Sequence, residues 1–235
     1  MPHPTAAGPG AASRPDAPGA PGVTRLPSHG PALDTALDAL LTGLRERGAR
    51  MLGLTGAPGA GKSTFAALLA ARSGAAVVPM DGFHLADVEL RRRGLLARKG
   101  APETFDPEGC AALLTRVRGR ESLVMAPAFE RGLEQPLAGA LPVPGGVDLV
   151  VVEGNYLLLD GAWARVHDQL DAVWHLRVAE PLRLARLVAR HEEFGKSPAE
   201  ARAWVDRVDG PNARLVEAAA SRADLVLDLS DLRLG

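Results

Sequence analysis

One short glycine-rich stretch limits the possible folds of this chain more than any other feature. The residues Gly56-Ala57-Pro58-Gly59-Ala60-Gly61-Lys62-Ser63 fit the pattern G-x-x-x-x-G-K-[ST], and Thr64 follows them. The stretch joins an apolar run at 49–56 to an amphipathic run at 62–74. A strand, a glycine loop and a helix in this order let backbone N–H groups surround a phosphate at the helix N-terminus. The stretch therefore predicts a nucleotide-binding loop.

Strands and helices are predicted to alternate along most of the chain. Apolar runs typical of strands cover residues 49–56, 75–80, 122–129, 147–154, 172–178 and 223–229. Patterns typical of helices cover 31–47, 62–74, 107–118, 161–170, 180–194, 198–208 and 210–222. This alternation predicts an α/β fold, a three-layer sandwich with a mostly parallel sheet and helices on both faces. The less regular segments, 91–106 and 129–146, are expected to be loops on the substrate side.

Composition indicates where the folded part begins and which partners to expect. Residues 1–30 are rich in Pro, Gly and Ala and predict a disordered leader, followed by one domain over residues 31–235. The formal net charge of −1 gives no sign of nucleic-acid or anionic-membrane binding. No apolar run is long enough to span a membrane. The lone cysteine, Cys110, fits a reducing compartment, so a cytoplasmic location is expected.

Other nucleotide-binding classes have sequence signatures that this chain lacks. Its three lysines are Lys62, Lys99 and Lys196, and none of them lies in the N/T-K-x-D element of a GTPase. The L-S-G-G-Q signature of a transporter ATPase is also absent. Two classes remain: a compact kinase that phosphorylates a small molecule, and a regulatory or assembly NTPase that acts through a protein partner.

Two acidic residues end predicted strands close to this loop. Glu153 ends the run "VDLVVVE" and has the Walker B position, where a carboxylate holds Mg²⁺ together with the Ser63 hydroxyl. Asp81 follows the run "AAVVPM". It could accept the proton of an attacking hydroxyl, bind Mg²⁺, or cap a helix over residues 84–93. Because Glu153 is the better magnesium candidate, the base is the leading hypothesis for Asp81.

Several motifs in a fixed order resemble a known group of kinases. They are "GAPGAGKST", "PMDGFHL", "RRRGLLARKGAPETFD", "VMAPAFER" and "VVVEGNYLLL". The set resembles the uridine kinase, phosphoribulokinase and type I pantothenate kinase group. With "RH" and "DGPNA" it is most similar to the bacterial nucleoside/nucleotide kinase, or fructose-transport-kinase-like, branch. The resemblance covers residues 50–228. It implies a P-loop fold with a helical lid at about 183–200, and ATP- and Mg²⁺-dependent phosphorylation of a small-molecule hydroxyl.

The resemblance also implies roles for single residues. Asp81 would be the catalytic base, and Lys62 with the amides of Gly56–Thr64 would bind the ATP phosphates. Arg183, Arg186 and Arg190 fall roughly on one face of the lid helix. Of these, Arg186 and Arg190 are the preferred phosphate ligands, because the planar guanidinium binds phosphate oxygens bidentately. The alternative is a solvated basic face.

The acceptor contacts are less defined. The candidates lie on loops next to the catalytic strand ends or in the "RKGAPETFD" motif: His84, Lys99, Arg131, Asn155 and Tyr156. Lys99 could meet an anionic acceptor or only anchor a loop, and Asn212 could reach adenine or cap a helix. The acceptor is a nucleoside, a sugar or a pantothenate-like molecule. Members of the group commonly dimerise, which makes a homodimer an open expectation.

Overall fold

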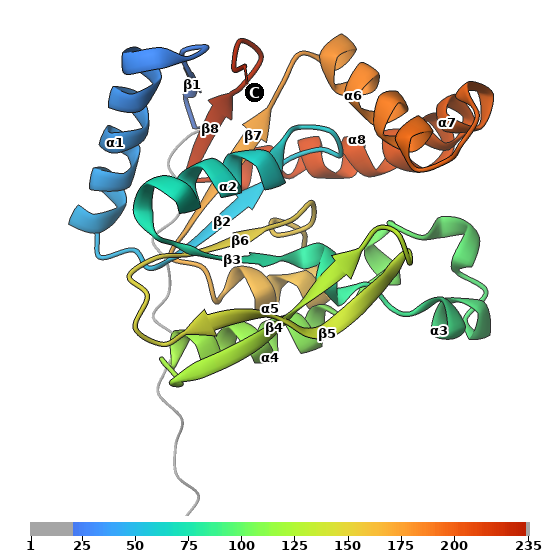
Figure 1. Ribbon diagram of the computed structural model, residues 1–235, viewed down its shortest axis with the longest axis horizontal. Helices are drawn as coiled ribbons and strands as arrows, with labels where there is room; N and C mark the ends of the chain where they lie inside the picture. The colour runs from blue at the N-terminus through green and yellow to red at the C-terminus, as the bar shows by residue number, and fades with distance from the viewer. Residues whose placement is uncertain (1–20, 234–235) are drawn as a thin grey trace, which may run out of the picture.

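The computed structural model describes residues 21–233 of the chain (Figure 1). The leader expected over residues 1–30 therefore lies mostly outside the described residues. Its last part is structured, because β1 (Val23–Arg25) pairs in parallel with β8 (Leu225–Asp228) and Leu26 is buried in the core. The expected domain start at residue 31 is thus too late. The three strand residues are exposed, so no alternating hydrophobic pattern marks them.

Within the described residues, six strands form a parallel sheet in the order β1-β8-β7-β2-β6-β3. The remaining members are β2 (Met51–Thr55), β3 (Ala76–Pro79), β6 (Val150–Glu153) and β7 (Ala172–Arg177). Every pairing in it is parallel, so all six carboxyl ends lie at one edge, to which the arrows of Figure 1 point. The parallel sheet predicted from the sequence is confirmed.

Helices cover both faces of this sheet. On one face α1 (Gly30–Glu46) and α2 (Lys62–Ser73) bury leucines and phenylalanine against β2 and β7, including Leu37, Leu44 and Phe65. On the other, α4 (Pro107–Arg118), α5 (Ala164–His167) and α8 (Gly210–Ala218) contribute apolar side chains such as Leu114 and Val166. The three-layer sandwich is therefore confirmed.

One predicted strand lies outside the sheet. β4 (Leu123–Glu130) pairs antiparallel with β5 (Gln135–Pro144) in a separate hairpin. The strand expected at 122–129 is confirmed, but it does not join the parallel sheet, and the loop expected at 129–146 is wrong because most of it is β5. Pro127 explains part of the difference, because proline cannot donate to a central ladder, and the pairing register shifts between Ala126 and Ala128. The hairpin packs against the turn Met80–Phe83.

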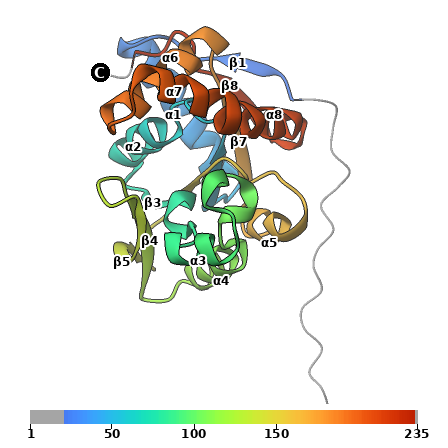
Figure 2. The same ribbon diagram turned by 90° about the vertical axis from the view of Figure 1, so that its right-hand side faces the viewer.

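The remaining helices gather near the carboxyl edge of the sheet (Figure 2). They are α3 (Asp87–Arg92), α6 (Glu180–Glu193) and α7 (Pro198–Trp204), which continues into a π-helical turn at Val205–Asp209. Pro211 lacks the N–H needed for an ordinary helical bond to Arg207, and such wide turns occur often at functional sites. In the part of the chain that the structure describes, no helix combines the length and hydropathy needed to cross a membrane.

Candidate active site

The glycine loop joins β2 to α2 as predicted. Gly59 and Gly61 have φ angles of +84° and +88°, which glycine adopts without a steric penalty. A Cβ at Gly56 would lie 2.3 Å from the carbonyl oxygen of Leu176, so only glycine fits there. Lys62 Nζ donates to the carbonyl oxygens of Gly56 and Ala57 at 3.0 and 3.2 Å. Lys62 is thus folded back against the start of the loop.

A large cavity opens above this loop. Its volume is about 930 Å³, and it reaches from the phosphate loop to α3, the hairpin, α6 and α8. Six of the predicted loop residues line it: Pro58, Gly59, Gly61, Lys62, Ser63 and Thr64. Ala57 and Ala60 belong to the same loop but are buried. The part of the loop from Pro58 onward is therefore the part open to a ligand, with Ala57 and Ala60 as buried support.

Glu153 and Ser63 meet at the carboxyl edge. Leu54 of β2 and Glu153 of β6 are register partners, which brings the end of β6 beside the loop. Ser63 Oγ donates to Glu153 Oε1 at 3.0 Å. Burial, followed by the negative charge of Asp81, raises the pKa of Glu153. A hydroxyl and a carboxylate are oxygen ligands that suit Mg²⁺, and a bound cation would favour the charged carboxylate.

Asp81 lies on the next strand end. Pro79 of β3 is the register partner of Glu153, and a 3₁₀ turn over Met80–Phe83 then presents Asp81 to the cavity. The side chain of Asp81 is 37% exposed, and its Oδ2 lies 3.9 Å from an Arg131 guanidinium nitrogen. The capping alternative is wrong, because α3 begins at Asp87 with Ala86 as its N-cap residue.

Glycine at position 82 is required by the packing of this turn. A Cβ there would lie 2.4 Å from the carbonyl oxygen of Pro127 in β4. The hairpin therefore presses directly on the backbone next to Asp81. A side chain at position 82 would therefore displace the backbone next to Asp81.

Four of the five predicted acceptor contacts line the cavity: His84, Lys99, Arg131 and Asn155. The His84 ring packs on Phe105, with centroids 3.9 Å apart, and its Nδ1 lies 2.8 Å from the Asp81 carbonyl oxygen. Burial lowers the pKa of His84, so the imidazole is neutral at neutral pH. It forms an uncharged wall beside Asp81.

Tyr156 does not meet the expectation of a direct acceptor contact. Its side chain is fully buried, packs against Phe105 and Trp163, and donates its hydroxyl hydrogen to the Gly100 carbonyl oxygen. The side chain of a residue after a strand end can point into the cavity or back into the core. The sequence pattern does not distinguish these two directions. Tyr156 therefore supports the loop at Gly100.

Lys99 lines the cavity, but its ammonium group is already engaged. Nζ lies 2.7 Å from Asp87 Oδ1, donates to the Glu134 carbonyl oxygen and sits 5.4 Å from the centre of the Phe129 ring. These contacts join the start of α3 to the hairpin. Of the two roles left open by the sequence, the structure favours the loop anchor.

The three arginines of α6 separate into two roles. Arg186 and Arg190 line the cavity above the loop. Arg183 is buried, and its guanidinium donates to the Pro58 carbonyl oxygen at 3.3 Å. Arg183 therefore holds the phosphate loop in place, whereas the other two are free to meet phosphate oxygens.

Sequence reasoning missed three cavity residues on the far side. His191 Nε2 lies 2.8 Å from Asp209 Oδ2, and the Trp204 ring stands 6.3 Å from the His191 ring. Asn212 also lines the cavity, and its Nδ2 donates to the Gly100 carbonyl oxygen at 3.1 Å, so it caps no helix. The motifs "RH" and "DGPNA" contain His191 and Asp209 and were the available signal.

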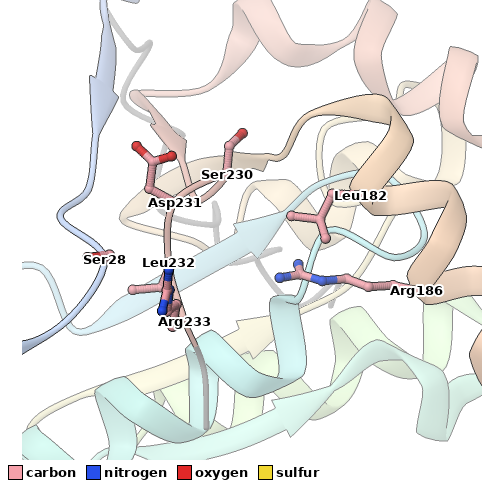
Figure 3. Close-up of a pocket in the computed structure, with 7 residues that line it drawn as sticks. All are labelled: Ser28, Leu182, Arg186, Ser230, Asp231, Leu232 and Arg233. Atoms are coloured by element: carbon pink, nitrogen blue, oxygen red, sulfur yellow. The ribbon is translucent and has the colours of Figure 1, made fainter.

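A second cavity of about 740 Å³ adjoins the first at Arg186. Figure 3 shows Arg186 reaching from α6 toward the chain segment after β8. The lining combines backbone, hydroxyl, apolar and charged groups: Ser28, Leu182, Arg186, Ser230, Asp231, Leu232 and Arg233. The two cavities share Arg186, and the glycine loop lines the larger one.

The parallel sheet, the phosphate loop after its central strand, the acidic strand ends and the arginine-bearing helix define the class of P-loop kinases. No protein-family model matches the chain. Schizosaccharomyces pombe protein C227.14, provisionally named a uridine kinase, is 34% identical over 194 residues, which cover 75% of this chain and 82% of the relative. The chain therefore belongs to the uridine kinase-like family of P-loop small-molecule kinases, and it is a phosphotransferase.

Two further comparisons agree with this assignment. A crystal structure from Silicibacter sp. TM1040, provisionally described as a fructose transport system kinase, is 41% identical with a TM-score of 0.71. The match covers 81% of this chain and 98% of that one. A pantothenate kinase of Bacillus velezensis is 32% identical over 115 residues, or 46% of this chain and 36% of the relative. The names of the relatives span several kinds of acceptor.

Proposed function

We propose that this protein transfers the γ-phosphoryl group of ATP to a hydroxyl group of a small molecule, with Asp81 as the general base. One observation carries the proposal. Asp81 lines the same cavity as Lys62 and the Ser63–Glu153 pair, from an adjacent strand end. A carboxylate beside the phosphate loop, but apart from the magnesium pair, is where an attacking hydroxyl needs a proton acceptor.

The remaining groups around the loop fit this reaction. Lys62 would exchange its bonds to the loop carbonyls for bonds to the β- and γ-phosphates. Arg186 and Arg190 would neutralise charge on the transferring group, since arginine donors aimed at developing charge stabilise a transition state. Ser63 and Glu153 would hold Mg²⁺, which would supply positive charge to the phosphates when bound.

The two cavities divide the substrates between them. The smaller cavity lies next to Arg186 and away from Asp81, which suits the base and ribose of ATP. The larger cavity contains Asp81, His84 and Arg131, which suits the acceptor. In this arrangement the γ-phosphate would lie between the lid arginines and Asp81, which line the same cavity.

Release of ADP in the presence and absence of acceptors tests the proposal. The panel is pantothenate, uridine, cytidine, fructose and ribulose 5-phosphate, each with MgATP and with the wild-type protein. The proposal predicts that at least one alcohol stimulates ADP release and is recovered with one added phosphoryl group. Stimulation by a protein partner alone, with no phosphorylated alcohol, would support a regulatory NTPase instead.

A further inference from the structure

The wall of the acceptor cavity formed by α6, α7 and the π-helical turn contains a buried carboxylate that the proposed reaction does not use. The Asp209 side chain is 10% exposed and belongs to the π-helical turn that precedes α8. Gly210 N–H bonds to the Val205 carbonyl oxygen across this wide turn. The turn allows Asp209 and Asn212 to line the same cavity. A carboxylate taken this far out of water is costly unless its oxygens find donors.

Among the described residues, only one oxygen of Asp209 has a hydrogen-bond donor. Oδ2 lies 2.8 Å from His191 Nε2, which orients the carboxylate. Oδ1 has no hydrogen-bond partner among residues 21–233. It is also not fully buried, so it is accessible from outside the protein core. It therefore faces the open cavity. No arginine or lysine of the described chain forms an ion pair with it.

The position of Asp209 places it near the transfer reaction. Burial lowers the pKa of Lys62, and the charges of Glu153, Asp81 and Asp209 oppose that shift. Both Asp81 and Asp209 also raise the pKa of Tyr156, after burial as the main cause. The two carboxylates thus act on the same groups from two walls of one cavity.

Two groups on this wall, Asp209 and Asn212, bring acceptor oxygens to the cavity lining. Asn212 uses its NH₂ group on the Gly100 carbonyl oxygen, which fixes the amide orientation and leaves its carbonyl oxygen as an acceptor. Lys99, the residue that favoured an anionic acceptor, is tied to Asp87 and Glu134. A ligand group that binds these two oxygens must therefore bring donors, which a hydroxyl group has and a carboxylate or phosphate at neutral pH lacks.

We infer that Asp209, oriented by His191, binds a second hydroxyl group of the acceptor, so that the substrate is a polyhydroxylated molecule held between two carboxylates. The inference rests on the proposed function. Asp81 faces the hydroxyl that is phosphorylated, and Asp209 fixes the molecule through another. The Trp204 ring, also in the cavity wall, is contacted by the cations of Lys196 and Arg207. A polyol of sugar type supplies the two hydroxyl groups.

Asp209→Asn is the direct test, with Asp206→Asn as its matched control. Asp206 lies on the same turn but is exposed. A hydrogen bond to a charged group contributes enough that Asp209→Asn should raise the acceptor KM by about tenfold to a hundredfold, with the KM for ATP unchanged within about twofold. Asp206→Asn should leave both unchanged. An unchanged acceptor KM in Asp209→Asn, or an equal rise in both KM values, would overturn the inference.

Deoxy analogues of the best acceptor give a second measurement that does not depend on a folded variant. For the wild-type protein, removal of one hydroxyl other than the phosphorylated one should lower kcat/KM at least tenfold, because Asp209 would lose its donor. For the Asp209→Asn variant, the kcat/KM values of the same analogue and of the full acceptor should differ much less. Equal kcat/KM for all deoxy analogues would contradict the role of Asp209.

The panel separates failure of this inference from failure of the proposed function. If a hydroxy acid with few hydroxyls is phosphorylated and every polyol is inert, the kinase proposal stands and the polyol inference is wrong. If no alcohol of any kind is phosphorylated, the proposed function is wrong and the inference falls with it. Phosphorylation of a polyol with the Asp209-dependent KM supports both.

Discussion

The carboxylates of Glu153 and Asp81 lie at adjacent strand ends, but their different surroundings suit different roles. Glu153 is 6% exposed and accepts the Ser63 hydroxyl hydrogen bond, an environment that suits a magnesium ligand. Asp81 is half-exposed at the cavity wall and faces Arg131, an environment that suits contact with a substrate. The distinction depends on burial and partners, because both residues follow apolar strands in the sequence.

At the same scale, Arg186→Ala should impair catalysis because Arg186 lines both cavities. Loss of a guanidinium that binds phosphate oxygens should lower kcat/KM for ATP by about a hundredfold. Arg202→Ala, an exposed arginine on α7, should change it less than twofold. Steady-state kinetics at saturating acceptor give both values. Equal effects of the two substitutions would mean that Arg186 belongs to a solvated basic face.

Sequence reasoning located residues whose chemistry is local and missed those that depend on distant contacts. Lys62 and Ser63 lie in one contiguous motif, so their place in the cavity could be predicted. Asp209 and His191 are 18 residues apart and meet across the π-helical turn. Tyr156 turns into the core because Gly100, 56 residues away, accepts its hydroxyl hydrogen. No short pattern records such pairs.

At the scale of elements, the phosphate loop is clamped between α2 and α6. A Cβ at Gly59 would lie 2.9 Å from both the Arg183 carbonyl oxygen and Leu187 Cγ. Gly59→Ala should therefore displace α6 and weaken ATP binding at least tenfold, measured by calorimetric titration. Gly74→Ala is the matched control, because Gly74 also has a positive φ but no neighbour within 4 Å.

The control isolates the effect of the clash from that of the backbone. Gly74→Ala should lower the free energy of unfolding by about 1 kcal/mol, the cost of a left-handed alanine, without changing ATP affinity. If both variants bound ATP equally well, the contact between the loop and α6 would have no part in nucleotide binding.

Lys99 connects two further elements, α3 and the β4–β5 hairpin. Lys99→Met would remove the contacts to Asp87 and Glu134 and loosen the acceptor wall. The acceptor KM should rise at least threefold, with little change in the KM for ATP. Arg98→Met, its exposed neighbour, serves as the control in the same kinetic assay. A larger rise for an anionic acceptor than for a neutral one would restore Lys99 as a direct ligand.

Strands that are buried on both faces of the sheet were predicted correctly, whereas the arrangement of β4 and the existence of β1 were not. The central strands β2 and β6 are buried along their whole length, and such continuous apolar runs are typical of parallel sheets. β4 shows alternating burial over its first residues and contains Pro127, which are signs of an antiparallel hairpin. β1 has only exposed residues, so its existence depends on the backbone partner that β8 supplies.

For the whole molecule, Cys110 should make stability fall at alkaline pH. Burial, followed by the charge of Asp106, raises the pKa of the thiol from 9.0 to about 12. Below pH 9 both states keep the proton, so no penalty arises. Above it the unfolded chain releases the proton while the folded chain cannot, and the free energy of unfolding drops by about 1.4 kcal/mol at pH 10 from this group.

Cys110→Ala isolates this effect from other groups that titrate in the same range. The substitution should lower stability by a similar amount at all pH values through the lost packing, but it should remove the drop attributed to the thiol. Urea unfolding at pH 7.5 and pH 10 provides the comparison. The same pH dependence in both proteins would show that the buried thiol does not contribute.

The central claim for the molecule as a whole is that it phosphorylates an alcohol with Asp81 as the proton acceptor. Asp81→Asn tests it most directly, with kcat measured on the best acceptor and ATP affinity measured by titration. We expect kcat to fall by about 10²- to 10⁴-fold, with the Kd for ATP within about threefold of wild type. Near-normal kcat in this variant would contradict the account.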